Sequence, residues 1–218
     1  MEEKVFVSWS GGKDSYLSLL KASEMGLAVH VLVTFMNSEE RSMSHGLSRE
    51  MLQEQAAALG LPLEVEMVTW EDYENGFMRV TDRLKEKGIT GGVFGDINLE
   101  GHREWVEKMC TRAALSPYLP LWGMGEDEVI FELLDRGARL VVVSVRGDLI
   151  NEEWLGKEVD MEFYQMCKAQ GISPCGENGE YHTLAAGGPL FKAPLRFDTG
   201  EIFKVKEWFF LKITPALS

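Results

Sequence analysis

Hydrophobic and polar residues follow two alternating patterns over the first 124 positions of the chain. Short runs rich in Val, Leu and Phe, typical of buried strands, are separated by longer stretches whose apolar residues recur at helical spacing. The patterns predict strands at residues 5–9, 29–35, 63–68 and 91–97, and helices at residues 14–25, 48–59, 70–87 and 100–114. This alternation indicates an α/β fold, a doubly wound parallel sheet with helices on both faces.

The regular alternation loosens after "YLPLW", residues 118–122. A helix is predicted at residues 126–136, a strand at 138–145 and a longer helix at 152–169, and Gly and Pro become frequent from residue 173. Two last strands are expected at residues 189–197 and 201–213, joined by a turn at Asp198, Thr199 and Gly200. We therefore expect a first domain over residues 1–124 and a smaller α+β domain over residues 125–218.

Composition narrows the class of protein. The 218 residues are 45% hydrophobic and 26% charged, as in ordinary globular proteins. A formal net charge of -13 without a Lys/Arg-rich cluster disfavours nucleic acid as a partner. No apolar stretch approaches a membrane span, and the Met-Glu-Glu-Lys start lacks the features of a signal peptide. Cys110, Cys167 and Cys175 form no CxxC pair, so we expect no disulfide framework and a protein that resides in the reducing cytoplasm.

The stretch "SGGKDS", residues 10–15, separates the first predicted strand from the first helix. Such a loop lies at the carboxyl end of a parallel sheet, and the exposed N–H groups of the next helix favour an anion there. Gly11 and Gly12 allow the backbone to bend around a phosphate, while Lys13 supplies positive charge. The alternative is a tight turn with a Ser or Asp cap. The spacing fits neither a Walker A loop nor a dinucleotide fingerprint, because Val7 and Asp14 stand where a Walker A loop needs Gly and Ser or Thr.

A second polar group lies in "PCGENGEYHT", residues 174–183. Glu177 and Glu180 are suited to bind a cation or accept a proton, and His182 to transfer one near neutral pH. A polar loop whose side chains only satisfy backbone groups is the alternative here.

The opening stretch resembles the PP-loop, SGGxDS, of the N-type ATP pyrophosphatases. Together with "GVFGDI", "HREWVE", "YLPLW", the late GE-x-GE-aromatic-x-T loop and "GPLF", it makes the chain similar to the diphthine–ammonia ligase family from Val5 to about Phe191. The resemblance implies an N-terminal nucleotide-binding domain and a smaller C-terminal domain that completes a cleft. The implied reaction is amidation of the carboxylate of diphthine on elongation factor 2, with ATP and ammonia consumed and AMP and pyrophosphate released.

The resemblance also implies roles for individual residues. Lys13, Asp96 and Glu180 are the catalytic candidates. The expected contacts of ATP are Ser10, Gly11, Gly12, Lys13, Asp14, Ser15, Thr34, Phe35 and Gly95. The expected contacts of the acceptor are Arg103, Glu177, Asn178, Glu180, Tyr181, His182 and Thr183. Mg²⁺ is expected with ATP, held largely by phosphates and water. Asp14 is the one residue that the sequence suggests as a further ligand. A homodimer is the candidate assembly.

Several alternatives stay open. Asp96 also fits a helix N-cap and Arg103 an exposed surface arginine. Family members that make diphthamide read EGGE-aromatic-E-T in the late loop, whereas Asn178 and His182 stand here. That difference resembles a bacterial-type branch linked to cobalamin-related metabolism, and it weakens the case for a quaternary ammonium substrate. The rivals are a PP-loop tRNA-modifying enzyme, a nucleotide sensor like the universal stress proteins, and the same chemistry on another carboxylate.

Overall fold

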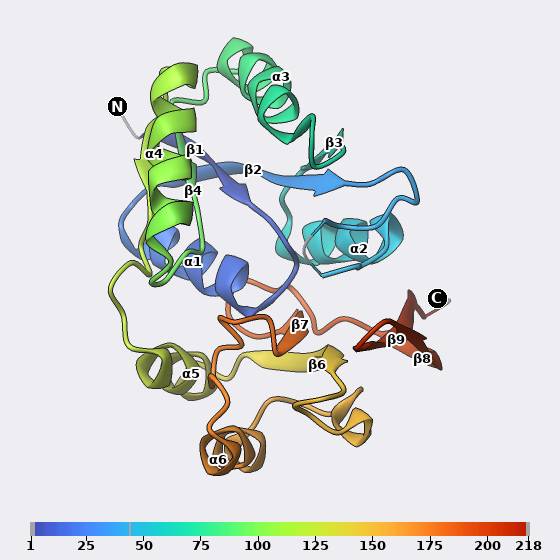
Figure 1. Ribbon diagram of the computed structural model, residues 1–218. Helices are drawn as coiled ribbons and strands as arrows, with labels where there is room; N and C mark the ends of the chain where they lie inside the picture. Colours follow the sequence, from blue (N-terminus) through green and yellow to red (C-terminus); the bar gives the residue numbers. More distant parts are fainter. Residues whose placement is uncertain (1–2, 44, 217–218) are drawn as a thin grey trace. The chain divides into compact units, whose positions relative to one another are not determined.

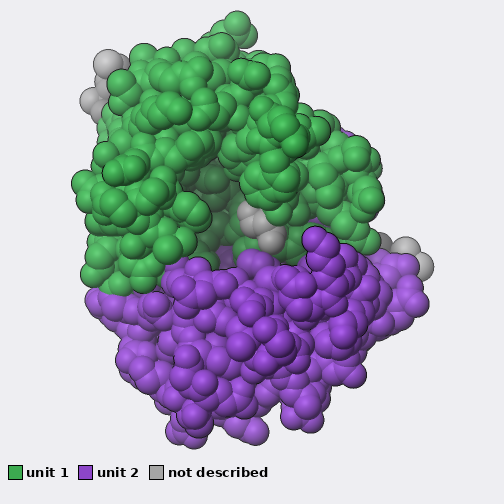
Figure 2. All heavy atoms as spheres, viewed as in Figure 1, with its two compact units in different colours: residues 1–10, 14–46, 60–124 green, residues 11–13, 47–59, 125–218 purple. Residues whose placement is uncertain are grey.

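The computed structural model describes residues 3–43 and 45–216. They form two compact units, shown in different colours in Figure 2. Unit 1 comprises residues 1–10, 14–46 and 60–124, and unit 2 comprises residues 11–13, 47–59 and 125–218. Two short segments of the first 124 residues thus belong to unit 2, and the linear division expected at residue 124 stays a prediction.

Unit 1 is built on a sheet of five parallel strands. The strands are β1 Lys4–Ser8, β2 Ala28–Met36, β3 Leu63–Met67, β4 Gly91–Val93 and β5 Ser116–Tyr118. Their order is β3-β2-β1-β4-β5 (Figure 1), so the direction of winding reverses between β1 and β4. The predicted doubly wound parallel sheet is confirmed, and β5 is a strand that the sequence pattern did not reveal.

Helices cover both faces of this sheet (Figure 1). Helices α3 Tyr73–Glu86 and α4 Glu100–Ala113 pack together, and α1 Lys13–Glu24 lies on the other side of the sheet. The core under α3 and α4 contains Phe6, Phe35, Phe77, Phe94 and Met109, all at most 6% exposed. Their burial follows from the apolar stripes that predicted these helices.

Unit 2 contains a four-stranded antiparallel sheet in the order β7-β6-β9-β8. The strands are β6 Arg139–Arg146, β7 Tyr181–Gly187, β8 Phe197–Val205 and β9 Trp208–Pro215. The helices of this unit are α2 Arg49–Leu59, α5 Glu126–Asp135, α6 Met161–Gln170 and the short 3-10 helix η1 Glu152–Trp154. This second sheet confirms the expected α+β character of the C-terminal region.

The single helix expected at residues 152–169 was wrong. The chain forms η1, leaves helical geometry, and starts α6 at Met161. Gly156 has a φ of +81°, a conformation that ends a helix, and the Asp160 side chain accepts a hydrogen bond of 2.9 Å from the Phe163 N–H. A break and a new N-cap therefore separate the two segments.

The expected last two strands were also placed wrongly. Residues 189–196 form no strand, and β7 instead begins at Tyr181, inside the segment predicted as a polar loop. The hairpin turn lies at Lys206 and Glu207 rather than at Asp198–Thr199–Gly200. Lys206 adopts a φ of +54°, as two-residue hairpins require, whereas Gly200 lies at an irregularity between Thr199 and Ile202 within β8.

Candidate active site

The winding of the first sheet reverses between β1 and β4, where ligands bind in doubly wound folds. Both strands end at predicted site residues of unit 1. β1 leads into Ser10, and β4 leads through Phe94 into Gly95 and Asp96. The fold thus brings the first strand's loop and the "GD" pair to the same edge of the sheet.

Gly95 packs directly against the first turn of α1. A Cβ at this position would lie 2.9 Å from the Asp14 carbonyl carbon, 3.0 Å from its oxygen and 3.1 Å from the Ser15 nitrogen. These are backbone atoms, which cannot rotate away. A glycine is therefore required for this close approach.

The two serines of the opening loop also contact one another. Ser10 Oγ donates to Ser15 Oγ at 3.2 Å, and Ser15 is only 4% exposed. Ser18 Oγ donates to the Ser15 carbonyl oxygen at 2.9 Å. The hydroxyls expected to bind phosphate are thus held beside the first turn of α1.

Asp96 lies in a partly buried, negatively charged environment. Its Oδ1 lies 3.1 Å from His102 Nδ1. Burial is the main cause that raises the pKa of Asp96; His102 opposes this, and the Asp14 carboxylate adds to it. Burial, together with Asp96, raises the pKa of Tyr73 to about 12. The Asp14 carboxylate and the partly buried Asp96 carboxylate, whose pKa it helps to raise, together suit a cation that also binds phosphates. Within residues 3–43 and 45–216, however, no cluster of three or more His, Cys, Asp or Glu side chains is arranged to hold a metal by itself.

In unit 2, the segment Gly11–Lys13 is hydrogen-bonded to β7. The Lys13 N–H donates to Thr183 Oγ1 at 3.0 Å, and the Ala185 N–H donates to the Gly11 carbonyl oxygen at 2.8 Å. Lys13 is 4% exposed, and its Nζ lies 5.8 Å from the centre of the Tyr181 ring. The opening loop and the late polar segment, far apart in sequence, therefore meet directly.

Gln55 of α2 is a contact of this loop that the sequence analysis missed. Its Nε2 donates to the Gly11 and Ala185 carbonyl oxygens, both at 2.8 Å, and the residue is fully buried. The signal was an amide on the apolar face of a predicted helix, beside Met51, Leu52 and Leu59. A polar residue at such a position needs partners.

The carboxylate of Glu180 is engaged by its own loop. Glu180 is 4% exposed, and its two oxygens accept from the Ser173 N–H at 3.4 Å, the Asn178 N–H at 3.0 Å and Asn178 Nδ2 at 3.2 Å. The Glu177 N–H donates to Ser173 Oγ at 3.1 Å. Glu180 thus closes the loop on itself, while Asn178 is exposed and Glu177 is half-buried.

The aromatic residues of the late segment face different surroundings. Tyr181 is 2% exposed, its hydroxyl donates to the Pro174 carbonyl oxygen, and its ring meets Phe163 edge-on. His182 is half-buried and stacks on Trp208 of β9, with ring centres 5.3 Å apart. Trp208 is a second residue that the sequence analysis missed.

Three other predicted contacts lie elsewhere in unit 1. Thr34 and Phe35 lie among the last three residues of β2, at 2% and 6% exposure, and Phe35 stacks on Phe77 within the core. Arg103 pairs with Glu107 on its own helix at 2.8 Å and lies 5.2 Å from the Trp122 ring. The Arg103 guanidinium thus already has an anionic neighbour, Glu107, and an aromatic one, Trp122. The roles predicted for these three residues stay predictions.

The three cysteines are buried and form no disulfide. Burial raises the pKa of the Cys110 and Cys167 thiols to about 12, so few thiolates exist at neutral pH. Cys110 and Cys167 are therefore poorly suited to thiol-based sulfur transfer.

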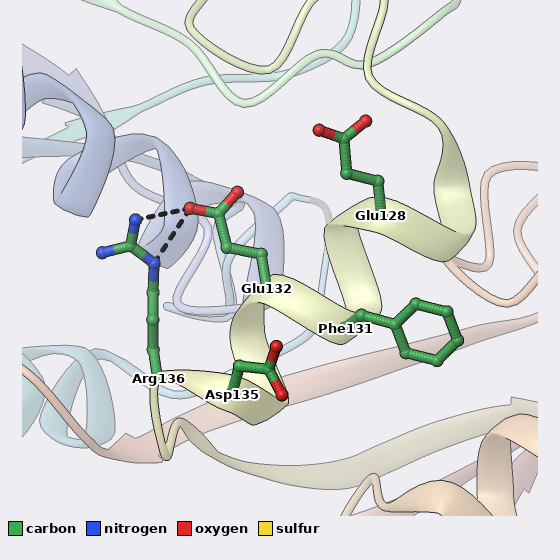
Figure 3. A pocket seen from close by; sticks show the side chains of 5 residues that line it. All are labelled: Glu128, Phe131, Glu132, Asp135 and Arg136. Carbon is green, nitrogen blue, oxygen red and sulfur yellow. Dashed lines mark hydrogen bonds and ion pairs between the residues drawn. The ribbon is translucent and has the colours of Figure 1, made fainter.

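A surface pocket of about 630 Å³ lies over α5 (Figure 3). It is lined by Glu128, Phe131, Glu132, Asp135 and Arg136, none of them a predicted site residue. Arg136 Nη2 pairs with Glu132 at 2.5 Å. Three carboxylates against one guanidinium make the pocket unsuited to phosphate.

No helix among the described residues has the length and apolar character needed to cross a membrane.

The parallel sheet, its glycine-containing first loop and the added antiparallel sheet define a PP-loop-like α/β protein. Residues 3–117 match the family model of the diphthamide synthase N-terminal domain, and residues 126–217 match that of the diphthamide synthase C-terminal domain. The chain belongs to the diphthamide synthase family.

Relatives with this family's architecture come from several eukaryotes. Diphthine–ammonia ligase of Rattus norvegicus is 29% identical over 220 residues, and that of Bos taurus 27% over 219; each match covers 88% of this chain and 82% of the relative. A solved structure from Methanocaldococcus jannaschii, described as a predicted subunit of tRNA methyltransferase, overlaps 85% of this chain and 98% of its own at 18% identity and a TM-score of 0.46. That overlap is too low to support a functional comparison.

Proposed function

We propose that this protein is an ATP-dependent ligase that adenylates a carboxylate and amidates it with ammonia, releasing AMP and pyrophosphate. The substrate proposed is diphthine on elongation factor 2. Membership of the diphthamide synthase family supports the reaction type, and the curated relatives are named diphthine–ammonia ligases.

The observation that carries this proposal is the direct contact between the two polar segments within unit 2. Thr183 accepts from the Lys13 N–H, and Ala185 donates to the Gly11 carbonyl. A ligase must present a phosphate-binding loop and an acceptor-binding loop to the same reacting atoms. A protein that only senses nucleotide has no need for the second loop.

The proposed chemistry has two steps. An oxygen of the acceptor carboxylate attacks the α-phosphorus of ATP, and the bond to the bridging oxygen breaks to release pyrophosphate. The nitrogen of ammonia then attacks the carbonyl carbon of the acyl-adenylate, AMP leaves, and the nitrogen loses a proton to form the amide. Residues Ser10, Gly11, Gly12, Lys13 and Ser15 would bind the phosphates, with Lys13 neutralising the charge that develops on pyrophosphate.

Mg²⁺ would be held by Asp14 and Asp96 together with the phosphates. Both carboxylates lie in unit 1, and the charge of Asp14 contributes to the raised pKa of Asp96, as expected of a pair that a cation would stabilise. A bound Mg²⁺ would neutralise phosphate charge.

The remaining predicted contacts divide by exposure. Thr34, Phe35 and Gly95 would shape the nucleoside side, and Arg103 would bind a carboxylate or phosphate. On the acceptor side, Glu177, Asn178 and His182 are exposed or half-buried and would contact the acceptor. Glu180, Tyr181 and Thr183 are buried and would hold the segment in place.

A second candidate is the same chemistry on a carboxylate without a permanent positive charge. His182 stands where diphthamide-forming relatives carry an acid, and its ring is stacked on Trp208 rather than offering a carboxylate. The absence of a carboxylate at this position removes an anionic partner for a quaternary ammonium, which favours an acceptor without a permanent positive charge.

The experiment is a mass-spectrometric assay of the full chain with MgATP and ammonium. Diphthine-bearing elongation factor and a panel of small carboxylates are offered in parallel. Mass gain consistent with amidation of the factor, with AMP and pyrophosphate formed, supports diphthine as substrate. Amidation of a small carboxylate alone supports the second candidate, and absence of AMP with every acceptor rejects the ligase.

The matched variants are Lys13→Met and Lys21→Met, both on α1. Lys13→Met keeps the length of the buried side chain but removes its charge, so AMP formation is expected to be abolished while the circular dichroism spectrum is retained. Lys21→Met is expected to retain activity. Size-exclusion chromatography of the same samples tests the proposed homodimer.

A further inference from the structure

Gln55 is a fully buried amide in the apolar face of α2. Burying an amide without partners is costly, so its hydrogen bonds explain why a polar residue is tolerated there. One side-chain nitrogen, Nε2, has two hydrogens and donates to two carbonyl oxygens, those of Gly11 and Ala185, at 2.8 Å each. The amide thereby joins the opening loop to β7, and both contacts lie within unit 2.

The Gly11 carbonyl oxygen accepts two hydrogen bonds, from Gln55 Nε2 and from the Ala185 N–H at 2.8 Å. The peptide bonds of the described residues are trans, and in a trans peptide the C=O and the following N–H point in opposite directions. Fixing the Gly11 carbonyl toward Gln55 therefore fixes the Gly12 N–H in the opposite direction.

Gly11 is the residue that makes this orientation accessible. Its φ is +83°, and a Cβ there would lie 2.7 Å from Gln55 Oε1 and equally close to side-chain carbons of Leu47 and Leu52. The Gln55 side chain thus fits against the side of Gly11 that lacks a Cβ. The loop conformation and the amide are matched to each other.

We propose that Gln55 is a positioning residue for nucleotide binding: it sets the Gly11–Gly12 peptide so that the Gly12 N–H is directed at the phosphates. This inference rests on the proposed function, since it assigns the phosphates of ATP to that loop. An N–H held in advance binds an anion without the cost of reorienting a flexible glycine pair. Gln55 acts only through the loop and does not contact the ligand.

The first test compares Gln55→Met with Gln53→Met, an exposed position of the same helix. Met fills similar volume but has no donor for the two carbonyls. Calorimetry measures binding of inorganic pyrophosphate, MgATP and adenosine at a temperature where each variant is folded. We expect Gln55→Met to weaken pyrophosphate and MgATP by about tenfold and to leave adenosine within about twofold, whereas Gln53→Met matches the wild type for all three.

The outcomes separate the two proposals. If the wild type binds neither pyrophosphate nor MgATP, the proposed function itself fails. If the wild type binds them and Gln55→Met is unchanged, or loses adenosine equally, Gln55 is only a structural amide and the inference is overturned.

Gln55→Glu provides an independent test should Gln55→Met fold poorly. An ionised carboxylate would repel both carbonyl oxygens, whereas the protonated acid donates one hydrogen bond. The ratio of variant to wild-type pyrophosphate affinity is therefore expected to rise as pH falls through the pKa of the introduced carboxyl. A ratio that does not change with pH contradicts the positioning role.

Discussion

The backbone N–H of Lys13 donates a 3.0 Å hydrogen bond to the side-chain oxygen of Thr183, 170 positions further along the chain. Lys13 begins α1, where N–H groups lack partners within the helix. Thr183 therefore serves as a cap supplied by a distant strand instead of by the residue before the helix.

Replacing Thr183 by Val removes the acceptor and keeps the shape of the side chain. We expect the free energy of unfolding to fall by about 0.5–2 kcal/mol, as for loss of an N-cap, and the KM for ATP to rise. Urea unfolding and steady-state kinetics measure the two effects. Thr183→Ser retains the hydroxyl and serves as the control; equal loss in both variants would show that the methyl packing, not the hydrogen bond, matters.

Gly95 is expected to tolerate no side chain because a Cβ meets the backbone of Asp14 at 2.9 Å. Gly95→Ala should lower the free energy of unfolding by about 1–3 kcal/mol, the usual effect of overpacking. ATP binding should weaken with it, since the first turn of α1 must shift. Gly101→Ala is the matched control, because a Cβ there meets nothing within 4 Å. Similar stability of the two variants would contradict this account.

Glu180→Gln changes one acceptor oxygen of the carboxylate into a donor. Its oxygens accept from the Ser173 N–H and from both nitrogens of Asn178, so at least one of these part-buried donors loses its acceptor, at about 0.5–1.5 kcal/mol. We expect ATP affinity to be retained and amide formation to be lost, as the acceptor segment loosens. Calorimetry with ATP and the mass-spectrometric assay check this, with Glu162→Gln on α6 as the control. Loss of ATP affinity to the same degree would place Glu180 on the nucleotide side instead.

The raised pKa of Asp96 predicts a pH-dependent stability. Because burial raises this pKa above its value in the unfolded chain, folding disfavours the ionised form. The contribution of Asp96 to the free energy of unfolding is therefore fully present below the unfolded pKa and is lost as pH rises through the higher folded pKa. The Asn side chain of Asp96→Asn stays neutral. The free energy of unfolding of this variant should therefore increase relative to that of the wild type as pH rises from the unfolded pKa of Asp96 through its higher folded pKa.

Urea unfolding of the wild type and Asp96→Asn from about pH 3 to about pH 8 measures this difference. His102→Gln removes the neighbour that opposes the shift and should move the transition to higher pH. A difference between wild type and Asp96→Asn that is constant over the whole range would falsify the burial argument.

The sequence alone determined the α/β class, the order of the first four strands along the chain and the two polar segments. These features depend on residues that are close together in the sequence. Strand and helix periodicities are properties of neighbouring residues, and the adjacent Gly11 and Gly12 indicate a loop without reference to the rest of the fold. Gly156 and Asp160 also carried a local signal, the break and cap that end one helical segment and begin α6, which the pattern of apolar residues concealed.

Only the tertiary structure decided what these segments contact. Residues 181–187 are polar at their start yet form β7, because β6 pairs with them along the antiparallel sheet. Gln55 looks like a misplaced polar residue until Gly11 and Ala185 lie beside it, and Thr183 caps a helix that begins 170 positions earlier. These partners are separated along the chain, and hydrogen bonds between distant segments leave no periodicity in the sequence that joins them.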